Sequence, residues 1–149
     1  LLAADMRVIA YDPYVEASSL EDGVSLAAWP EQVQAADFVV VNCALTPSSH
    51  HLLNAEAFAA MKPGVRVVNV GRGPVIDEQA LIAALASGKV HSAALDVFEQ
   101  EPLPADSPLR THPSCIFGSH NASNTVDGVE RTSHKASQLL AGFLQEAKS

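Results

Sequence analysis

The sequence predicts an α/β fold with a doubly wound parallel sheet, and two observations lead to this prediction. Five apolar runs of strand length alternate with segments that carry helix signals. Within these runs apolar residues follow one another continuously, as they do in parallel strands that are covered on both faces. Ligands bind such sheets beyond the carboxyl ends of the strands, so the residues that follow each strand are the first candidates for a functional site.

The first strand is expected at residues 6–11, after the tail of a helix at residues 1–5, and it ends at Asp12. A strand that follows a helix and ends in an acid is typical of the second strand of a dinucleotide-binding unit, where the acid accepts hydrogen bonds from a ribose. Such a unit also needs a glycine-rich phosphate loop, about 20 residues upstream of the acid. The printed sequence has no such loop, because its one similar stretch, GRGPVI at residues 71–76, carries isoleucine at the third glycine position.

The helices are predicted from their start and stop signals. Pro30 suits the first turn of a helix because its φ angle is fixed, and Asn54 and Asp77 are of the types that cap a helix N-terminus. Gly64 and Gly88 follow two helical segments and favour their ends. Helices are expected at residues 54–62, 77–89 and 125–148, and a further helix that starts at Pro30 is expected within residues 25–36. A short helix or turn is expected at residues 15–23.

The remaining elements follow from apolar runs and from proline. After the first strand, further strands are expected at residues 37–45, 65–70, 90–98 and 115–120. Residues 99–114 carry four prolines and are expected to form an irregular loop. The last helix has apolar residues at helical spacing, which predicts a stripe that faces the body of the protein. This stripe comprises Val126, Val129, Leu139, Leu140, Phe143 and Leu144.

Composition and charge argue against several classes of function. With 9 Lys and Arg against 17 Asp and Glu the net charge is −8, and no basic cluster is present to hold nucleic acid phosphates. No apolar run approaches the ~20 residues of a membrane span, so no membrane partner is expected. Cys43 and Cys115 form no C-x-x-C motif, and without a secretory signal we expect two reduced thiols in a cytoplasmic protein. His50 and His51 have no third ligand at metal-binding spacing, so we interpret them as a solvated loop pair and expect no metal.

The residues that follow the predicted strands combine one arginine, one histidine and several acids. They are Asp12, residues 42–44, residues 71–73, residues 96–101 and residues 119–121. An arginine there can bind a carboxylate through two hydrogen bonds. A histidine can move a proton near neutral pH, and an acid beside it orients the ring and favours its charged form. The strand ends therefore include the means to hold a carboxylate and to move a proton.

Three stretches together are more specific than any single motif: YDPY at residues 11–14, the long run at residues 44–109, and GSHNASNT at residues 118–125. They resemble the nucleotide-binding domain of D-isomer-specific 2-hydroxyacid dehydrogenases, most closely the phosphoglycerate dehydrogenase-like members, and the resemblance covers essentially the whole chain. It implies a Rossmann-type fold, NAD as cofactor, a 2-hydroxy acid or 2-keto acid as substrate, and a homodimer for the intact protein. Residues 1–149 are accordingly interpreted as one NAD-binding domain.

The resemblance also implies roles for individual residues. Arg72 would grip the carboxylate and carbonyl of the substrate, His120 would exchange the hydroxyl proton, and Glu101 would stabilise the charged imidazole. Asp12 would hold the ribose and favour NAD over NADP, because a 2′-phosphate would face its carboxylate. Asp96 would meet the nicotinamide amide. The residues implied to line the cofactor are Asp12, Cys43, Val70, Gly71, Arg72, Asp96, His120, Asn121, Ala122 and Ser123.

Measured against that family, the chain is interpreted as the incomplete C-terminal portion of the domain. The family's first strand, its glycine loop and the N-terminal part of its substrate domain have no counterpart in the printed sequence. In the strand order 3-2-1-4-5-6 the first strand is central, so a gap is expected between the strand that ends at Asp12 and the strand that ends near Asn42. The intact protein is expected to be an NAD-dependent dehydrogenase and the isolated chain to be inactive. A non-enzymatic NADH-binding regulator, resembling a corepressor, and an inactive remnant stay open as alternatives.

Overall fold

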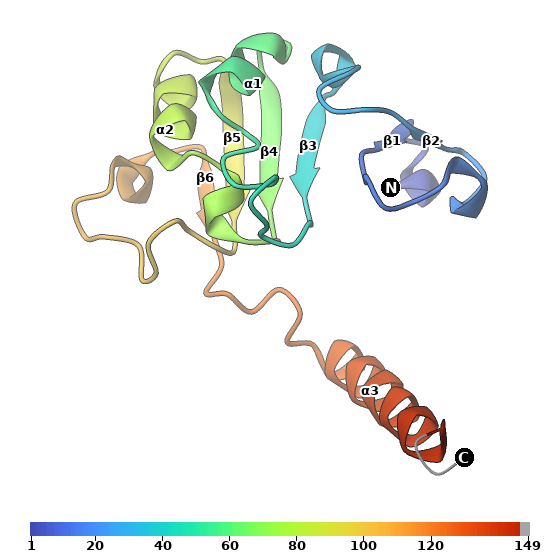
Figure 1. The fold of residues 1–149 in the computed structure, drawn as a ribbon. Coiled ribbons are helices and arrows are strands. Elements are labelled where there is room, and N and C mark those ends of the chain that lie inside the picture. Colours follow the sequence, from blue (N-terminus) through green and yellow to red (C-terminus); the bar gives the residue numbers. More distant parts are fainter. Residues whose placement is uncertain (147–149) are drawn as a thin grey trace.

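The structure is a computed structural model that describes residues 1–146 (Figure 1). The main body contains a parallel sheet of four strands in the order β3-β4-β5-β6. These strands are β3 (Phe38–Val41), β4 (Val65–Asn69), β5 (Val90–Leu95) and β6 (Cys115–Phe117). The predicted α/β fold with a parallel sheet is therefore confirmed.

Two helices lie along one face of this sheet (Figure 1). They are α1 (Ala55–Ala60) and α2 (Glu78–Ala86). The side chains of Asn54 and Asp77 each accept a hydrogen bond of 3.0 Å from a main-chain N–H of the helix that they precede. Both predicted caps are therefore confirmed, and both helices end a few residues earlier than the sequence suggested.

The hydrophobic core lies between the two helices and the sheet. Successive residues of β4 alternate between faces, so Val65 and Val67 are buried against the helices while Arg66 and Val68 lie half-buried on the other face. Each large apolar side chain that is fully buried stabilises the fold by about 1.5–3 kcal/mol relative to an exposed position. The helical side of the core is filled by Leu53, Phe58, Met61, Leu81 and Leu85.

The opposite face of the sheet has no covering layer among the described residues. Phe38 and Val40 on β3 are close to half-exposed, and Ile116 on β6 is 72% exposed. The guanidinium of Arg66 lies 5.5 Å from the centroid of the Phe38 ring, in a cation–π arrangement that covers part of it. The expectation of a sheet covered on both faces therefore holds for one face only.

The N-terminal residues form a separate parallel pair of strands, β1 (Val8–Ala10) and β2 (Val24–Leu26). Neither strand pairs with β3 within residues 1–146, which agrees with the gap expected from the family's strand order. β2 was not predicted, because a strand of three residues that is paired with a distant segment leaves little local signal.

The helix expected at residues 25–36 is absent from the structure. Its place is taken by the end of β2 and by a short 3-10 turn at Val33–Ala35. Gln32 has a φ angle of 63°, and this left-handed conformation interrupts any helix begun at Pro30. The short elements expected at residues 1–5 and 15–23 are likewise single 3-10 turns.

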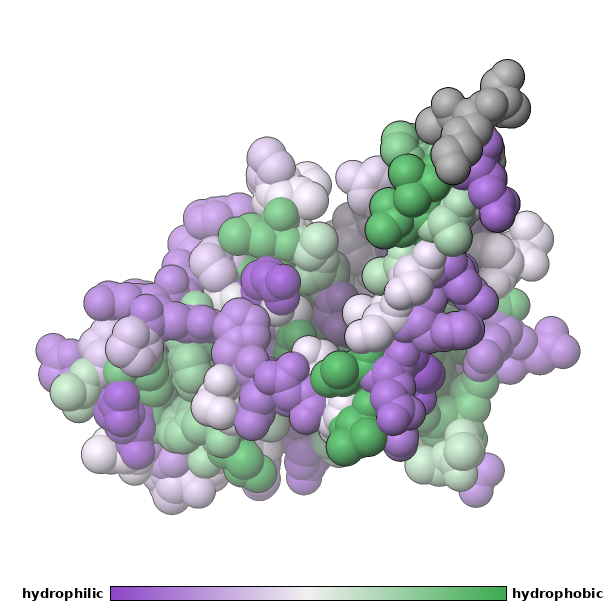
Figure 2. Space-filling view, turned by 90° about the horizontal axis from the view of Figure 1, so that it is seen from below, coloured by the Kyte–Doolittle hydropathy of each residue, from purple (hydrophilic) through white to green (hydrophobic). Residues whose placement is uncertain are grey.

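The last helix, α3 (Val126–Glu146), projects away from the sheet after the segment 118–125 (Figure 1). The prediction that its apolar stripe faces the body is wrong, because exposure along the stripe runs from 50% at Leu144 to 75% at Val126. In Figure 2 apolar side chains are accordingly visible on the arm that carries the terminal residues. Helical spacing shows that a helix is amphipathic but does not identify the surface that its apolar side meets. The predicted end of the helix, residues 147–148, lies outside the described residues, and no helix within them is long and apolar enough to cross a membrane.

Candidate active site

The carboxyl ends of the four main strands lie at one edge of the sheet, because all four strands are parallel. The segments that leave this edge carry most of the residues singled out from the sequence. Cys43 follows β3, Arg72 follows β4, Glu101 lies in the loop after β5, and His120 follows β6. The fold therefore gathers at one edge side chains that are up to 77 residues apart in sequence (120 − 43).

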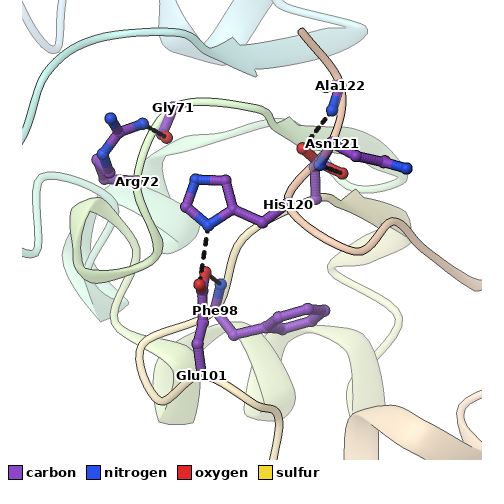
Figure 3. Close-up of polar contacts among 8 residues, drawn as sticks. Gly71, Arg72, Phe98, Glu101, His120, Asn121 and Ala122 are labelled. Carbon is purple, nitrogen blue, oxygen red and sulfur yellow. Dashed lines mark hydrogen bonds and ion pairs between the residues drawn. The ribbon is translucent and has the colours of Figure 1, made fainter. Parts of the chain in front are cut away.

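His120 and Glu101 form a hydrogen-bonded pair at this edge (Figure 3). Nδ1 of His120 lies 2.8 Å from Oε2 of Glu101, and the N–H of Phe98 donates to Oε1 of the same carboxylate at 3.0 Å. The hydrogen bond from His120, followed by the one from Phe98, holds the pKa of Glu101 below its ordinary value. Because an ionised carboxylate only accepts hydrogen bonds, the ring donates from Nδ1 and leaves Nε2 to accept a proton.

The main chain at His120 is held by Asp96. His120 has a φ angle of 60°, a left-handed conformation that is unfavourable for a residue with a side chain. The two carboxylate oxygens of Asp96 accept the N–H groups of Asn121 at 3.1 Å and Ala122 at 2.8 Å. The carbonyl of Asp96 accepts the N–H of His120 at 2.9 Å. A Cβ on Gly118 would lie 2.0 Å from Oδ1 of Asp96, so only glycine allows this close approach.

Asp96 therefore anchors the turn that aims the imidazole, a structural role that the sequence did not suggest. The contact with a nicotinamide amide implied by the family resemblance stays a prediction. The carboxylate oxygens already have main-chain partners, so any further donor would share them.

Arg72 is presented by a turn that a buried asparagine shapes. Asn69, the last residue of β4, is 1% exposed; its Oδ1 accepts the N–H of Gly71 and its Nδ2 donates to the carbonyl of Arg72, both at 3.1 Å. The side chain of Arg72 is exposed, and its Nη1 donates to the carbonyl of Gly71 at 2.7 Å (Figure 3). Sequence reasoning missed Asn69, although a single amide in the apolar run VRVVNV was a usable signal.

The turns after β3 and β4 pack main chain against main chain. A Cβ on Gly71 would lie 2.8 Å from the carbonyl oxygen of Cys43, so a side chain at this position would force the turns apart. Val70 is 37% exposed and Cys43 is also exposed. The two strand ends thus offer a partly apolar surface next to the Arg72 turn.

A cavity of about 390 Å³ lies beside the His120–Glu101 pair, and both residues belong to its lining. Phe98 and Phe117 contribute apolar walls, with their ring centroids 5.8 Å apart. Sites for small molecules typically have volumes of about 300–1,000 Å³. The cavity is therefore large enough for a small organic molecule next to a group that can move a proton.

Among the described residues, Asp12 and Ser123, two residues of the predicted site, form no hydrogen bond with the candidate catalytic side chains. Asp12 lies just after β1, and its Oδ1 accepts the N–H of Tyr14 at 2.9 Å. Ser123 is exposed in the segment between β6 and α3. Within residues 1–146 no hydrogen bond connects the side chain of Asp12 or Ser123 to Arg72, Glu101 or His120.

The interpretation of the adjacent histidines as a solvated pair needs a correction. The rings of His50 and His51 stack with centroids 4.0 Å apart, and Nε2 of His51 lies 2.6 Å from Oε1 of Glu99. His51 is therefore engaged with the loop that carries Glu101. Among the described residues no three metal-ligating side chains come together.

The predicted contacts of this sheet edge with a nicotinamide stay a prediction, and the exposure of the residues there is compatible with them. The exposed surface at Val70 and Cys43 adjoins the Arg72 turn, and His120 supplies a proton acceptor from the neighbouring strand end. For the pyrophosphate, residues 1–146 contain no glycine-rich loop of the dinucleotide-binding type.

A parallel sheet with these groups at its carboxyl edge is the architecture of a nucleotide-binding domain. The chain belongs to the D-isomer specific 2-hydroxyacid dehydrogenases, because residues 1–122 match the NAD binding domain of that family. The resemblance inferred from the sequence motifs is thereby confirmed. Helix α3 begins after the matched residues.

Relatives with curated names include two kinds of dehydrogenase. The chain is 56% identical over 93 residues to glyoxylate/hydroxypyruvate reductase B of Citrobacter koseri, a match that covers 62% of the chain and 29% of the relative. It is 40% identical over 141 residues to the chloroplastic D-3-phosphoglycerate dehydrogenase 2 of Arabidopsis thaliana, covering 94% of the chain and 23% of the relative. The chain thus spans less than a third of the length of either protein.

Solved structures agree with this family. The D-isomer specific 2-hydroxyacid dehydrogenase from Xanthobacter autotrophicus Py2, in complex with NADPH and MES, is 40% identical to the chain with a TM-score of 0.69. The match covers 76% of this chain and 36% of that one. The family therefore uses NAD(P), and its cofactor preference has to be argued for each member.

Proposed function

We propose that the protein containing this chain transfers a hydride between NAD(H) and a D-2-hydroxy acid or the corresponding 2-keto acid. The candidate substrates are phosphoglycerate-like acids and acids such as glyoxylate and hydroxypyruvate, which the names of the relatives suggest. The observation that carries the proposal is the His120–Glu101 pair, joined at 2.8 Å at the sheet edge that also presents Arg72.

His120 is the proposed acid–base group. A bound nicotinamide would supply the hydride chemistry. In the oxidation direction neutral His120 accepts the hydroxyl proton of the substrate at Nε2. Glu101 stabilises the resulting imidazolium through the hydrogen bond from Nδ1. Because its pKa is held below the ordinary value, Glu101 keeps its charge across the pH range in which a histidine titrates. In the reduction direction the imidazolium returns its proton to the carbonyl oxygen.

Arg72 is the proposed carboxylate anchor. Its planar guanidinium matches a carboxylate through two parallel hydrogen bonds, which fixes the orientation of the acid as well as its position. In the structure Nη1 donates to the carbonyl of Gly71. A guanidinium has five N–H donors, so this contact leaves donors for a carboxylate.

NAD is the proposed cofactor, in preference to NADP. The argument is the carboxylate of Asp12 at the end of β1, which would repel a 2′-phosphate. The test is kcat/KM with NADH and NADPH for the unmutated full-length protein and for Asp12→Ala. We expect kcat/KM of the unmutated protein to be higher with NADH than with NADPH, and this difference to be smaller in Asp12→Ala. Equal or better use of NADPH by the unmutated protein would contradict the assignment.

We also propose that residues 1–149 form an incomplete, C-terminal portion of the NAD-binding domain and bind the cofactor weakly on their own. In support, β1 pairs only with β2 and β3 only with β4 within residues 1–146. Such strand edges and exposed apolar side chains favour association between copies. Calorimetric titration with NADH beside size-exclusion chromatography tests this, and a monodisperse monomer that binds NADH in the low micromolar range would overturn it.

A homodimer and a cytoplasmic location stay predictions for the whole protein. The Arabidopsis relative is chloroplastic by its name, so location differs among relatives. Light scattering on the full-length protein would test the dimer.

The proposed reaction is tested with the full-length protein and a panel of 2-keto acids in the presence of NADH or NADPH. Consumption of reduced cofactor and formation of the D-hydroxy acid are the expected results. Tight NADH binding without turnover of any keto acid in the panel would contradict the proposal and favour a non-enzymatic NADH-binding regulator.

A further inference from the structure

Glu99 ties together three segments next to the candidate active site. Its Oε1 lies 2.6 Å from Nε2 of His51, in the loop between β3 and α1. Its Oε2 accepts the N–H of Glu78, the first residue of α2, at 2.9 Å. Both side chains of the ion pair are about one-third exposed, so the contact is partly shielded from water. One carboxylate from the loop after β5 thus holds a loop and a helix that belong to other parts of the sequence.

The histidine loop is in turn fixed to the segment that follows Arg72. The N–H of His51 donates to the carbonyl of Pro74 at 2.9 Å, and the N–H of Leu53 donates to the carbonyl of Val75 at 3.1 Å. The N–H of Asp77 returns a hydrogen bond of 3.0 Å to the carbonyl of Leu53. The two bonds of Leu53 form an isolated parallel bridge with Ile76, and the bond from His51 to Pro74 holds the main chain of His51 against the segment that follows Arg72.

That same segment packs directly on the loop that carries Glu101. A Cβ on Gly73 would lie 1.8 Å from the carbonyl oxygen of Phe98 and 2.6 Å from the main-chain nitrogen of Glu99. Such distances are impossible for real atoms, so only glycine lets the two main chains approach this closely. The loops that bear Arg72 and Glu101 therefore meet where Gly73 packs on the main chain of Phe98 and Glu99.

We propose that His51 and Glu99 are positioning residues that hold the Glu101 loop against the Arg72 turn. They thereby set the distance between the proton-transferring pair and the carboxylate anchor. Phe98 makes the connection, because it precedes Glu99 in sequence and its N–H fixes the carboxylate that holds His120. The proposal rests on the function proposed above, because positioning matters only if Arg72, Glu101 and His120 have the roles proposed there. His51 and Glu99 themselves are assigned no chemical step.

Glu99 also affects the acid at the start of α2. Burial raises the pKa of the Glu78 carboxyl, the main-chain hydrogen bond with Glu99 lowers it, and the negative charge of Glu99 raises it. The contact with Nε2 of His51 gives the Glu99 carboxylate a second partner beside this helix.

The test uses the full-length enzyme and compares Glu99→Ala with Glu99→Gln, which keeps the acceptor for the N–H of Glu78. We expect Glu99→Ala to lower kcat about 10-fold, because small misplacements of reacting groups are costly. The KM for NADH should change by no more than about twofold, since neither residue is assigned to the cofactor, and Glu99→Gln should recover most of kcat. The matched control is Gln100→Ala, in the same loop and without an assigned contact, which should behave like the unmutated enzyme.

A double-mutant cycle adds a readout that general destabilisation would not give. His51→Ala should lower kcat to a similar or smaller extent, and the double variant should be no slower than Glu99→Ala, because the His51 side chain acts only through its contact with Glu99. Unchanged kcat in Glu99→Ala, additive losses in the double variant, or no recovery in Glu99→Gln would each overturn the proposal. His120→Ala and Glu101→Gln belong in the same assay. If both retained full turnover, the proposed function would fail, whereas a loss in these two without a loss in Glu99→Ala would refute only the positioning role of His51 and Glu99.

Discussion

The main body, from β3 to β6, and the C-terminal helix α3 differ in how far their large apolar side chains are buried. Between β3 and β6 the large side chains on the helical side of the sheet are buried, with Leu53 and Leu81 1% exposed and Phe58 2% exposed. On α3 side chains of the same kind remain in contact with water, with Leu139 62% exposed and Phe143 67% exposed. The sequence patterns of the two regions look alike, because both carry apolar residues at helical spacing.

The difference shows that an apolar pattern determines the local conformation but not the burial of a segment. α1 and α2 each follow a strand and turn back onto the sheet, so their apolar sides meet a surface formed by neighbouring residues. α3 follows the segment 118–125, which leads away from the sheet, and it meets no such surface among the described residues (Figure 1). Arg72 and Glu101 lie in loops that follow the packed strands β4 and β5, whereas His120 follows β6, on which Ile116 is 72% exposed.

The largest expected effect is a difference in the free energy of unfolding between a substitution in the main body and the same substitution on α3. In the chain of residues 1–149, Phe58→Ala should lower the free energy of unfolding by about 3–5 kcal/mol, because it leaves a cavity in the core. The matched change Phe143→Ala on α3 should alter it by less than about 0.5 kcal/mol, because that ring is already exposed. Urea denaturation at low protein concentration measures both, and similar losses in the two variants would mean that α3 is packed after all.

The next largest effect is a difference in kcat/KM between a substitution in the candidate site and the same substitution on α3. In the full-length enzyme, Arg72→Lys should lower kcat/KM by about 100-fold, because a point charge cannot reproduce the planar fork that orients the substrate. Arg131→Lys, the same change on α3, should leave kcat/KM unchanged. Steady-state kinetics with a 2-keto acid and NADH measure both, and an Arg72→Lys enzyme with ordinary kinetics would remove Arg72 from the site.

The smallest expected effect concerns the pH dependence of stability. Hydrogen bonds from His120 and Phe98 hold the pKa of Glu101 below its ordinary value. The carboxylate therefore stabilises the fold above the pKa of the unfolded chain, about 4.3, and this contribution disappears as the pH falls through the lower pKa of the folded state. Because Glu101 is partly exposed, the contribution should be below about 1 kcal/mol.

Thermal unfolding of the unmutated chain and of Glu101→Gln between pH 3 and pH 7 would measure this effect. The two melting temperatures should differ most near neutral pH and converge at the acid end. A constant difference across the range would show that the carboxylate charge has no part in the pair.

Local signals predicted the packed region well. Asn54 and Asp77 were recognisable as helix caps, and the strands of the main sheet followed from continuous apolar runs. What could not be predicted depends on contacts between distant segments. The pairing of β2 with β1 spans 16 residues (24 − 8), and the exposure of α3 depends on a surface rather than on a pattern.

The same distinction applies to the candidate site. Arg72, Glu101 and His120 were found because they occupy strand ends and match the motifs of a known family, and their catalytic roles remain proposals. The supporting contacts were not foreseen: Asn69 beneath Arg72, the main-chain bonds of Asp96, and the link from His51 to Glu99. Each of these residues is polar and belongs to no recognisable motif of its own. Its hydrogen-bond partner becomes evident only in the folded chain.

The most direct measurement of the central claim combines turnover and cofactor binding in one variant of the full-length enzyme, His120→Ala. Loss of the proton-transferring group should lower kcat by about 100-fold or more. Calorimetric titration should show an NADH affinity within a few fold of that of the unmutated enzyme, because the other residues predicted to line the cofactor stay in place. Ordinary turnover in this variant would contradict the assignment of the strand-end site as the catalytic centre.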